Sequence, residues 1–512
     1  MSFDSLQNNK RIAKNTLMLY FRMFLTMGIS LFTSRVVLKT LGVEDFGIYN
    51  VVGGIVAMLG LIHGVMGGGT VRYLNIALGK EDDELAHKTF NVCFVIFVGI
   101  GIALLLLAET IGLWFLNNKM VIPDNRLFAA NCVYQFTIFS AINKLLVTPY
   151  NSLIIAHEKM SVFAYISILE VVLKLVIVYV LLVLPFDRLI VYGILLMSCE
   201  FMITCVYRFF CIRRYPESKL KFYSDWPFYK EMLSYSSWNL FGSAATLVKG
   251  QGLNILLNMF FNPSVNASRA IAYQINSAIT QFSNNFYTAV KPQIFKYYAK
   301  EDLDNMFKLV FRSSKMSFFL IFFFSLPITI EAPCIIQLWL GQLPENVVVF
   351  VRFIVCISAV EGMAHPLMTT CHATGKIALY QSLVGSVTIL NIPISYIFLK
   401  LDFPPVTVFI ISLVIAILCL FIRLWLVKRL VNFPVFLYIK EIFGSVLLII
   451  ILAGCAPIFL HNLMSESYLR FIVVCCTCVI STTLFTYFIG LNAGEREFIK
   501  NTVAQKFKRR AV

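Results

Sequence analysis

Residues 92–108 read VCFVIFVGIGIALLLLA, an apolar run without a charged side chain. Comparable runs recur at 190–205, 318–330 and 406–420. Each approaches the roughly 20 residues that a helix needs to span the hydrocarbon core of a bilayer. A soluble fold would have to hide all of these runs in one core, whereas a membrane accommodates them directly. The runs therefore predict a polytopic membrane protein.

The composition of the whole chain agrees with this prediction. Of its 512 residues, 59% are hydrophobic and 14% are charged, whereas soluble domains carry about a quarter charged residues. Residues 1–14 are polar and contain no apolar stretch, so we expect no secretory signal peptide. Most of the 13 cysteines lie inside apolar runs without histidines at metal-ligand spacing, which predicts packed thiols and no metal site.

The apolar runs, and the charged segments between them, predict an all-α fold with about 14 transmembrane helices. Their approximate spans are 15–37, 47–70, 90–113, 127–155, 162–183, 189–211, 234–261, 269–290, 309–331, 346–371, 378–399, 405–427, 441–461 and 469–490.

The basic residues indicate how these helices are oriented. With the N-terminus inside, about thirty Lys and Arg residues fall in cytoplasmic segments and about seven in outward segments. This asymmetry is typical of the positive-inside rule, so both termini are expected to face the cytoplasm. The net charge of +16 is therefore interpreted as a topology signal, and no nucleic-acid partner is expected.

The two halves of the chain share four landmarks in the same order, which predicts an internal repeat. Six predicted helices separate the equivalent landmarks, so both halves cross the membrane in the same direction, as in a parallel repeat about an axis along the membrane normal. The landmark pairs are Lys80-Glu81-Asp82 with Lys300-Glu301-Asp302, Leu113-Trp114 with Leu338-Trp339, Pro123-Asp124-Asn125 with Pro344-Glu345-Asn346, and the set Pro149, Ala156 and Lys159 with Pro366, Ala373 and Lys376.

The repeat predicts a domain organisation with two six-helix lobes. This architecture is typical of an alternating-access transporter that holds its substrate between the lobes. The predicted parts are an N-terminal lobe 1–211, a charged cytoplasmic linker 212–233, a C-terminal lobe 234–430, two additional transmembrane helices 431–490 and a basic cytoplasmic tail 491–512.

Several of these features resemble the bacterial polysaccharide flippases of the multidrug/oligosaccharidyl-lipid/polysaccharide exporter superfamily. They are the stretch Asn15–Asn50 with its loop LGVEDFGIY at 41–49, the helix end LWLG at 338–341, the Pro149 and Pro366 elements, and the helix count. The resemblance implies flipping of an undecaprenyl-pyrophosphate-linked oligosaccharide to the outer leaflet of the inner membrane, for O-antigen, capsule or exopolysaccharide assembly. It also implies a polysaccharide polymerase and glycosyltransferases as partners.

Polar and charged residues at membrane depth are candidates for the substrate route, because an unpaired charge there costs several kcal/mol. Cations suit a pyrophosphate, and the amides of the predicted helix 269–290 suit sugar hydroxyls. The alternatives are snorkelling to the surface for Arg22, pairing with a buried acid for Lys249, and hydrogen bonding between helices for the amides. The central-cavity candidates are Arg22, Lys144, Lys249, Asn254, Asn258, Gln274, Asn276, Gln281 and Asn284.

Other ionisable residues have plainer interpretations. Lys174 follows Glu170 by four residues, which predicts an ion pair on one helix. Arg35 and Arg352 are expected to anchor at the membrane interface, and Glu109 and Glu331 to reach headgroup water. The candidates for coupling transport to H⁺ or Na⁺ are Glu200, Glu361, His63 and His365, although both acids are also expected to pair with buried cations and both histidines have packing as the alternative.

Three other functions compete with an oligosaccharide flippase. A multidrug exporter of the same superfamily should place acids at its midplane, whereas here intramembrane cations outnumber acids. A peptidoglycan-precursor flippase shares the expected fold and an anionic lipid substrate. A membrane polymerase or glycosyltransferase is disfavoured because no phosphate-binding glycine loop, metal-ligand cluster or nucleophile constellation occurs. The sequence thus predicts a transporter, not an enzyme, with no cofactor besides a coupling ion.

Overall fold

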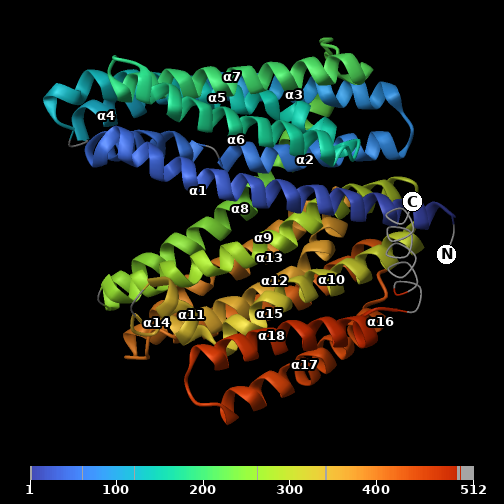
Figure 1. Ribbon diagram of the computed structural model, residues 1–512. Helices are drawn as coiled ribbons and strands as arrows, with labels where there is room; N and C mark the ends of the chain where they lie inside the picture. The colour runs from blue at the N-terminus through green and yellow to red at the C-terminus, as the bar shows by residue number, and fades with distance from the viewer. Residues whose placement is uncertain are drawn as a thin grey trace, which may run out of the picture. The chain divides into compact units, whose positions relative to one another are not determined.

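The computed structural model describes residues 3–59, 61–119, 122–261, 263–340, 343–492 and 496 (Figure 1). Within these residues the chain is all-helical and no strand occurs, so the predicted fold class is confirmed. The chain divides into two compact units. The N-terminal unit comprises Arg11–Leu240 and Phe295–Glu301, and the C-terminal unit comprises Met1–Lys10, Phe241–Ile294 and Asp302–Val512.

The N-terminal unit is built around α5, which packs against α2, α3 and α7. Its core contains the fully buried Phe90, Tyr150 and Leu153, and the Phe90 and Tyr150 rings meet edge to face at 5.2 Å. Its helices are α1 (Phe3–Leu59), α2 (Leu61–Gly79), α3 (Asp83–Leu107), α4 (Leu113–Lys119), α5 (Leu127–Ala156), α6 (Met160–Val183) and α7 (Arg188–Arg214), with a π-helical turn Ala108–Gly112 between α3 and α4.

The helix α1 is continuous through a segment that the sequence assigns to a loop between two helices. Its backbone breaks only at Gly42, where φ is 79° and ψ is 171°. A residue with a Cβ atom is strained in this region, so glycine permits the sharp change in direction. The predicted helices 15–37 and 47–70 are therefore joined by a one-residue kink instead of a loop.

The C-terminal unit is built around α12, which packs between α10 and α15, while α17 and α18 pair with each other and against α10. Phe350 and Phe409 stack in its core with ring centroids 4.3 Å apart. The remaining helices are α8 (Trp226–Phe260), α9 (Pro263–Ala299), α10 (Leu303–Ile330), α11 (Ala332–Leu340), α12 (Val347–Ala373), α13 (Ile377–Ile389), α14 (Asn391–Lys400), α15 (Thr407–Val431), α16 (Val435–Tyr438), α17 (Gly444–Leu463) and α18 (Tyr468–Phe485).

Ten helical stretches in the described part of the chain are long and apolar enough to cross a membrane, as expected for a multi-pass membrane protein. The helices α1, α2, α8 and α9, which open the two halves, are not among them. The helix α9 carries a run of amides and hydroxyls, which lower its hydropathy. The count of 14 transmembrane helices therefore stays a prediction.

The repeat landmarks adopt matching backbone conformations. Glu81 and Glu301 both have φ of 58°, and the aspartate after each one caps the next helix by accepting from a backbone N–H. The turn after α5 has Glu158 with φ of 58°, and its counterpart after α12 has Gly375 with φ of 78°. These local geometries show equivalent turns at two of the four landmark pairs, the first and the last along the chain.

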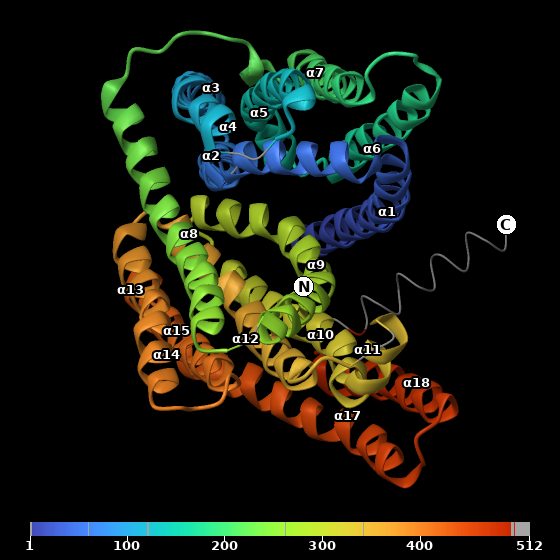
Figure 2. The same ribbon diagram turned by 90° about the vertical axis from the view of Figure 1, so that its left-hand side faces the viewer.

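The connection from α7 to α8 packs along the N-terminal unit (Figure 2). Asn91 of α3 bonds to two of its backbone groups, accepting from the N–H of Lys221 at 2.7 Å and donating to the carbonyl of Lys219 at 3.1 Å. Lys88 pairs with Asp225 in the same segment. The connection is therefore held by side chains of α3 over most of its length.

Candidate functional site

A cluster of charged residues lies among the helices of the N-terminal unit, centred on Glu200 of α7. The Glu200 Oε1 atom lies 3.1 Å from Lys174 Nζ of α6 and 3.4 Å from Lys144 Nζ of α5. Lys174 also pairs with Glu170, one helical turn earlier. The predicted Glu170–Lys174 pair is confirmed. Glu200 pairs with cations as predicted, but Lys174 is only partly buried and Lys144 is exposed.

This cluster keeps a surplus of positive charge. The two carboxylates balance the two lysines, and Arg22 of α1 lies over the Phe163 ring at 4.6 Å, near enough to Glu170 for an electrostatic interaction. The Lys144 side chain is 56% exposed, whereas that of Glu200 is only 11% exposed. The cations at its edge can therefore meet an anion while the buried carboxylate holds them in position.

A second cluster lies in the C-terminal unit, around His365 of α12. The His365 ring is tilted against the Tyr287 ring with centroids 5.3 Å apart, and the Tyr287 hydroxyl contacts the Thr369 hydroxyl. Glu361 and Lys291 both interact electrostatically with His365. His365 therefore faces an acid on its own helix and a cation from α9.

Arg423 of α15 completes this second cluster. Its Nε atom donates to the Tyr380 hydroxyl at 3.2 Å, and its charge interacts with Glu361. Arg423 and Lys291 are both partly buried within helices. The predicted helix 269–290 ends just before Lys291, whereas α9 continues to Ala299.

The helix α9 carries a polar stripe on its exposed side. Gln274, Ser277, Gln281 and Asn284 follow one another at intervals of three and four residues, so they share one helical face, and all four are exposed. Asn276 lies on a different side of the helix, and its partly buried Oδ1 atom has no hydrogen-bond partner among the described residues. Of the four predicted α9 candidates, three therefore belong to the stripe and Asn276 does not.

Two candidates lie on α8, where Lys249 is partly buried and Asn254 is bound by an arginine. Arg269 donates from Nη1 to Asn254 Oδ1 at 3.2 Å and from Nη2 to the Gly250 carbonyl at 2.8 Å. Arg269 opens the predicted helix 269–290, whereas α9 begins earlier, at Pro263, so Arg269 lies inside the helix and against α8.

The remaining candidates include several whose side chains lie outside the described part of the structure. They are Arg35, His63 and Asn258. Arg352, expected at the interface, is exposed and donates from Nε to the Thr329 carbonyl at 3.0 Å.

The two acids expected to reach headgroup water, Glu109 and Glu331, differ from each other in burial. Glu109 is partly buried and accepts from Gln135 Nε2 at 3.1 Å. The Glu331 side chain is only 1% exposed, with His461 Nδ1 at 2.8 Å and Arg470 Nε at 3.5 Å. The expectation for Glu331 was wrong because α17 and α18 cover it and supply its partners.

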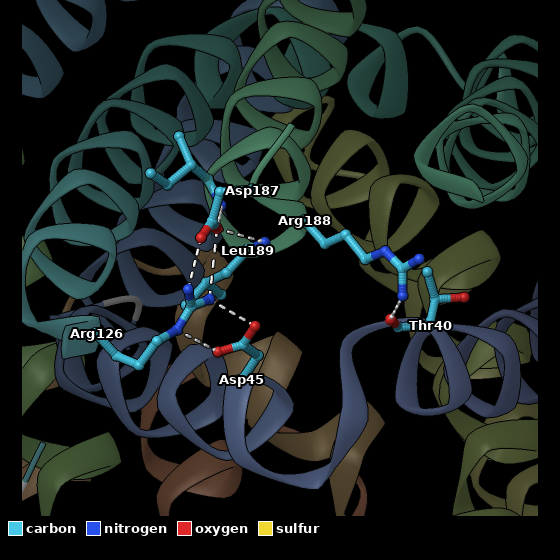
Figure 3. A network of polar contacts seen from close by, with 7 residues as sticks. Thr40, Asp45, Arg126, Asp187, Arg188 and Leu189 are labelled. Atoms are coloured by element: carbon cyan, nitrogen blue, oxygen red, sulfur yellow. Dashed lines mark hydrogen bonds and ion pairs between the residues drawn. The ribbon is translucent and has the colours of Figure 1, made fainter. Parts of the chain in front are cut away.

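A further polar network holds the kinked segment of α1 (Figure 3). Arg126 bonds Asp45 through two nitrogens, at 2.8 and 2.6 Å, and reaches Asp187 Oδ2 at 2.5 Å. Asp187 also accepts from the backbone N–H groups of Leu189 and Ile190 at the start of α7. Burial raises the pKa of Asp187, but these hydrogen bonds lower it by more, so the pKa lies below its ordinary value.

At the other end of the N-terminal unit, Glu158 is a buried acid with two cationic partners. Its side chain is 1% exposed, with Lys296 Nζ at 2.6 Å and Arg11 Nη1 at 3.3 Å. The nearby Gly79 lies so close to α9 that a Cβ atom there would be 2.9 Å from the Ala299 Cβ. The C-terminal end of α9 is therefore fixed to the ends of α2 and α5. Sequence reasoning missed this contact because the partners are far apart in the chain.

Comparisons with known proteins agree with this arrangement of helices. A sequence model of the family described as polysaccharide biosynthesis protein matches residues 12–298. None of the curated proteins compared with the chain matches its sequence.

Solved structures of transporters share the fold. An outward-facing multidrug resistance MATE family transporter of the MOP superfamily superposes with a TM-score of 0.71 at 12% identity, over 85% of this chain and 99% of that chain. The structure of MATE in complex with MaD3S superposes with a TM-score of 0.70 at 12% identity, over 83% of this chain and 97% of that chain. A MOP superfamily transporter from Pyrococcus furiosus superposes with a TM-score of 0.66 at 12% identity, over 82% of this chain and 96% of that chain.

Proposed function

Because the chain belongs to the polysaccharide biosynthesis protein family and has the fold of MOP superfamily transporters, we propose that it is a lipid-linked oligosaccharide flippase. The substrate would be an undecaprenyl-pyrophosphate-linked oligosaccharide, moved from the cytoplasmic to the outer leaflet of a bacterial inner membrane. Its glycan would enter a surface polysaccharide such as O-antigen or exopolysaccharide.

The observation that carries this proposal is the surplus of cations among the membrane-depth helices. In the N-terminal unit Arg22 adds to two balanced Lys–Glu pairs. In the C-terminal unit Lys291 and Arg423 both interact electrostatically with His365, and Arg423 also interacts with Glu361. A pyrophosphate brings negative charge into a medium of low dielectric constant, where such cations offset its desolvation cost.

The polar stripe on α9 supports the saccharide part of the proposal. Gln274, Gln281 and Asn284 are uncharged hydrogen-bonding groups exposed along a helix of membrane length. Lipid does not satisfy such groups, whereas water or sugar hydroxyls do. The polyprenyl tail needs no polar route because it remains soluble in the bilayer.

Coupling to H⁺ belongs to the same proposal. Glu361 and His365 lie one helical turn apart and interact electrostatically, so protonation of either group changes the charge that faces Lys291 and Arg423. Glu200 is less suited to this role, since two lysines already engage it.

Translocation in proteoliposomes tests the proposal. The Arg22→Ala/Lys249→Ala variant should insert normally and lose about tenfold or more of its flipping rate for an undecaprenyl-pyrophosphate-linked oligosaccharide, because charge-assisted contacts to phosphate are lost. The matched control Lys428→Ala/Arg429→Ala, at the end of α15, should keep the wild-type rate. A wild-type rate in the first variant would reject the cationic route.

The MATE fold makes a drug exporter the second candidate function. A solved relative from Pyrococcus furiosus is described as having a binding pocket of reverse polarity that suggests a different function, so one fold serves pockets of different charge. The same vesicles should transport no organic cation above the protein-free background. Organic-cation efflux without oligosaccharide flipping would favour the exporter, and flipping of a peptidoglycan-precursor lipid alone would favour that substrate.

A further inference from the structure

An open groove lies on the outer face of α7, near the C-terminal end of the helix. It has a volume of about 490 Å³ and is lined by Cys205, Arg208, Phe209, Ile212 and Arg213. These positions follow the spacing of a single helical face. The groove surface is apolar almost throughout, and Arg208 and Arg213 line it with their aliphatic stems.

The same face is apolar and exposed further towards the middle of the helix. Phe201 and Met202 are exposed there, one to two turns before the groove, and within the groove Phe209 is 67% exposed. In a membrane protein, such a stripe faces lipid acyl chains. The two arginines therefore stand where a lipid-facing surface meets the headgroup region.

The charges of Arg208 and Arg213 are not balanced by acids. Among the described residues, neither guanidinium has a carboxylate within ion-pair distance, and Arg213 lies over the Phe209 ring at 5.9 Å. The only acid on α7, Glu200, is buried and engaged by lysines. An anion from outside the chain would therefore meet uncompensated positive charge.

Capping of the helix end accounts for only part of this pattern. Arg213 and Arg214 lie in the last turn of α7, where cations stabilise the C-terminal carbonyl groups. Arg208 lies six residues before the end, about 9 Å deeper along the axis, beyond the range of that effect. Its position on the exposed face requires a different partner.

We propose that this groove binds one anionic phospholipid. An acyl chain lies along Phe209, Ile212 and Cys205, and the phosphate is held by Arg208 and Arg213. Guanidinium groups bind phosphate oxygens in a forked geometry, and their aliphatic stems extend the apolar wall. This site is distinct from the charged cluster around Glu200 and does not depend on the transported substrate.

Native mass spectrometry of the full chain tests the proposal with defined lipids. The detergent-purified protein is incubated with dioleoyl phosphatidylglycerol or dioleoyl phosphatidylcholine, and the retained lipid is counted. The wild type should retain the anionic lipid roughly 25-fold more strongly, since each of the two basic residues near the phosphate contributes roughly a fivefold preference. The Arg208→Gln/Arg213→Gln variant should lose this preference and keep only weak, equal retention of both lipids.

A matched control separates this groove from basic residues in general. The Lys428→Gln/Arg429→Gln variant removes two cations from the last turn of α15 and should retain the anionic lipid as the wild type does. All three proteins should elute as one folded species, because the exchanged side chains are exposed. Unchanged lipid preference in the α7 variant, an equal loss in the α15 control, or a second copy of the chain that excludes lipid from this face would each overturn the proposal.

Discussion

At the scale of single residues, buried acids organise the interior of the helical units. Glu200, Glu158 and Glu331 each accept from two cationic or imidazole groups on other helices. A carboxylate buried without partners would be very costly, so each acid specifies which helices must meet. The sequence could identify Glu200 as a cation partner, because it stands alone among apolar residues. It could not identify which cations.

Replacement of Glu200 tests this role. Glu200→Gln should destabilise the protein by about 1–2 kcal/mol, a value discounted because the Lys144 side chain is largely exposed. Thermal unfolding in detergent measures the change. Glu170→Gln leaves Lys174 paired with Glu200 and should cost less. If the two variants were equally stable, Glu200 would have no special part in holding α5, α6 and α7 together.

At the scale of elements, α1 and the α7–α8 connection depend on a few local contacts. The break in α1 requires one glycine, and the following segment is fixed by the Asp45–Arg126 pair. The connection is fixed by α3 and by a bond between His157 Nε2 and Glu217 Oε1 at 2.8 Å, with the His157 ring stacked on Tyr215. The contribution of single residues to the conformation of both elements can therefore be tested by substitution.

The kink in α1 gives the first prediction at this scale. Gly42→Ala should destabilise the protein by about 1–3 kcal/mol, because alanine is strained at φ of 79° although no atom stands within 4 Å of the added Cβ. Gly28→Ala, which also adds a Cβ in open space but in ordinary helical backbone, should be neutral or slightly stabilising. Thermal unfolding compares the pair, and equal effects would contradict a backbone origin.

The α7–α8 connection gives a prediction about pH. Burial raises the pKa of Glu217, but hydrogen bonds from His157 and from backbone lower it by more, so the folded-state pKa lies below the ordinary 4.5. A depressed acid pKa stabilises the folded form fully above 4.5, and this contribution is lost as the pH falls through the lower, folded value. Proteolysis of residues 215–225 should therefore increase as the pH falls below about 4.5.

The variant Glu217→Gln provides the control for this pH effect. It removes the titrating group, so the connection should be cleaved more readily at neutral pH and show a weaker increase in acid. An acid-stable protease and a fixed digestion time keep the two proteins comparable. Identical pH profiles for wild type and variant would exclude Glu217 as the responsible group.

At the scale of the whole molecule, α9 takes part in both compact units. Residues 263–294 belong to the C-terminal unit, and Phe295–Glu301 belong to the N-terminal unit. The second stretch is fixed by the Lys296–Glu158 pair and by the more exposed Lys300–Glu81 pair, which joins two equivalent turns of the repeat. In the proposed flippase, a movement of α9 would have to act on these contacts.

These two ion pairs differ in burial, which yields a further prediction. Lys296→Met should destabilise the protein by about 1–3 kcal/mol, since it leaves the buried Glu158 with Arg11 as a more distant partner. Adding Glu158→Gln should recover part of this loss in a double-mutant cycle. Lys300→Met, at the exposed pair, should leave thermal unfolding nearly unchanged. Additive effects at positions 158 and 296 would show that the pair contributes nothing.

The sequence by itself determined the membrane class, the approximate helices and the repeat. These features are local: an apolar run has to leave water whatever its neighbours, and Glu81 and Glu301 adopt the same turn because their surrounding residues are alike. Local signals were less reliable at helix ends: the predicted helix 269–290 is shorter at both ends than α9, which runs from Pro263 to Ala299.

Only the tertiary structure decided which charges meet. Glu331 and His461 are 130 residues apart in the chain, and Lys296 and Glu158 are 138 apart. Composition and spacing cannot specify such a pair, because the energy of a buried charge depends on the partner that another helix brings to it. For the same reason, only the packing of α9 and α15 shows that Lys291 and Arg423 both interact electrostatically with His365.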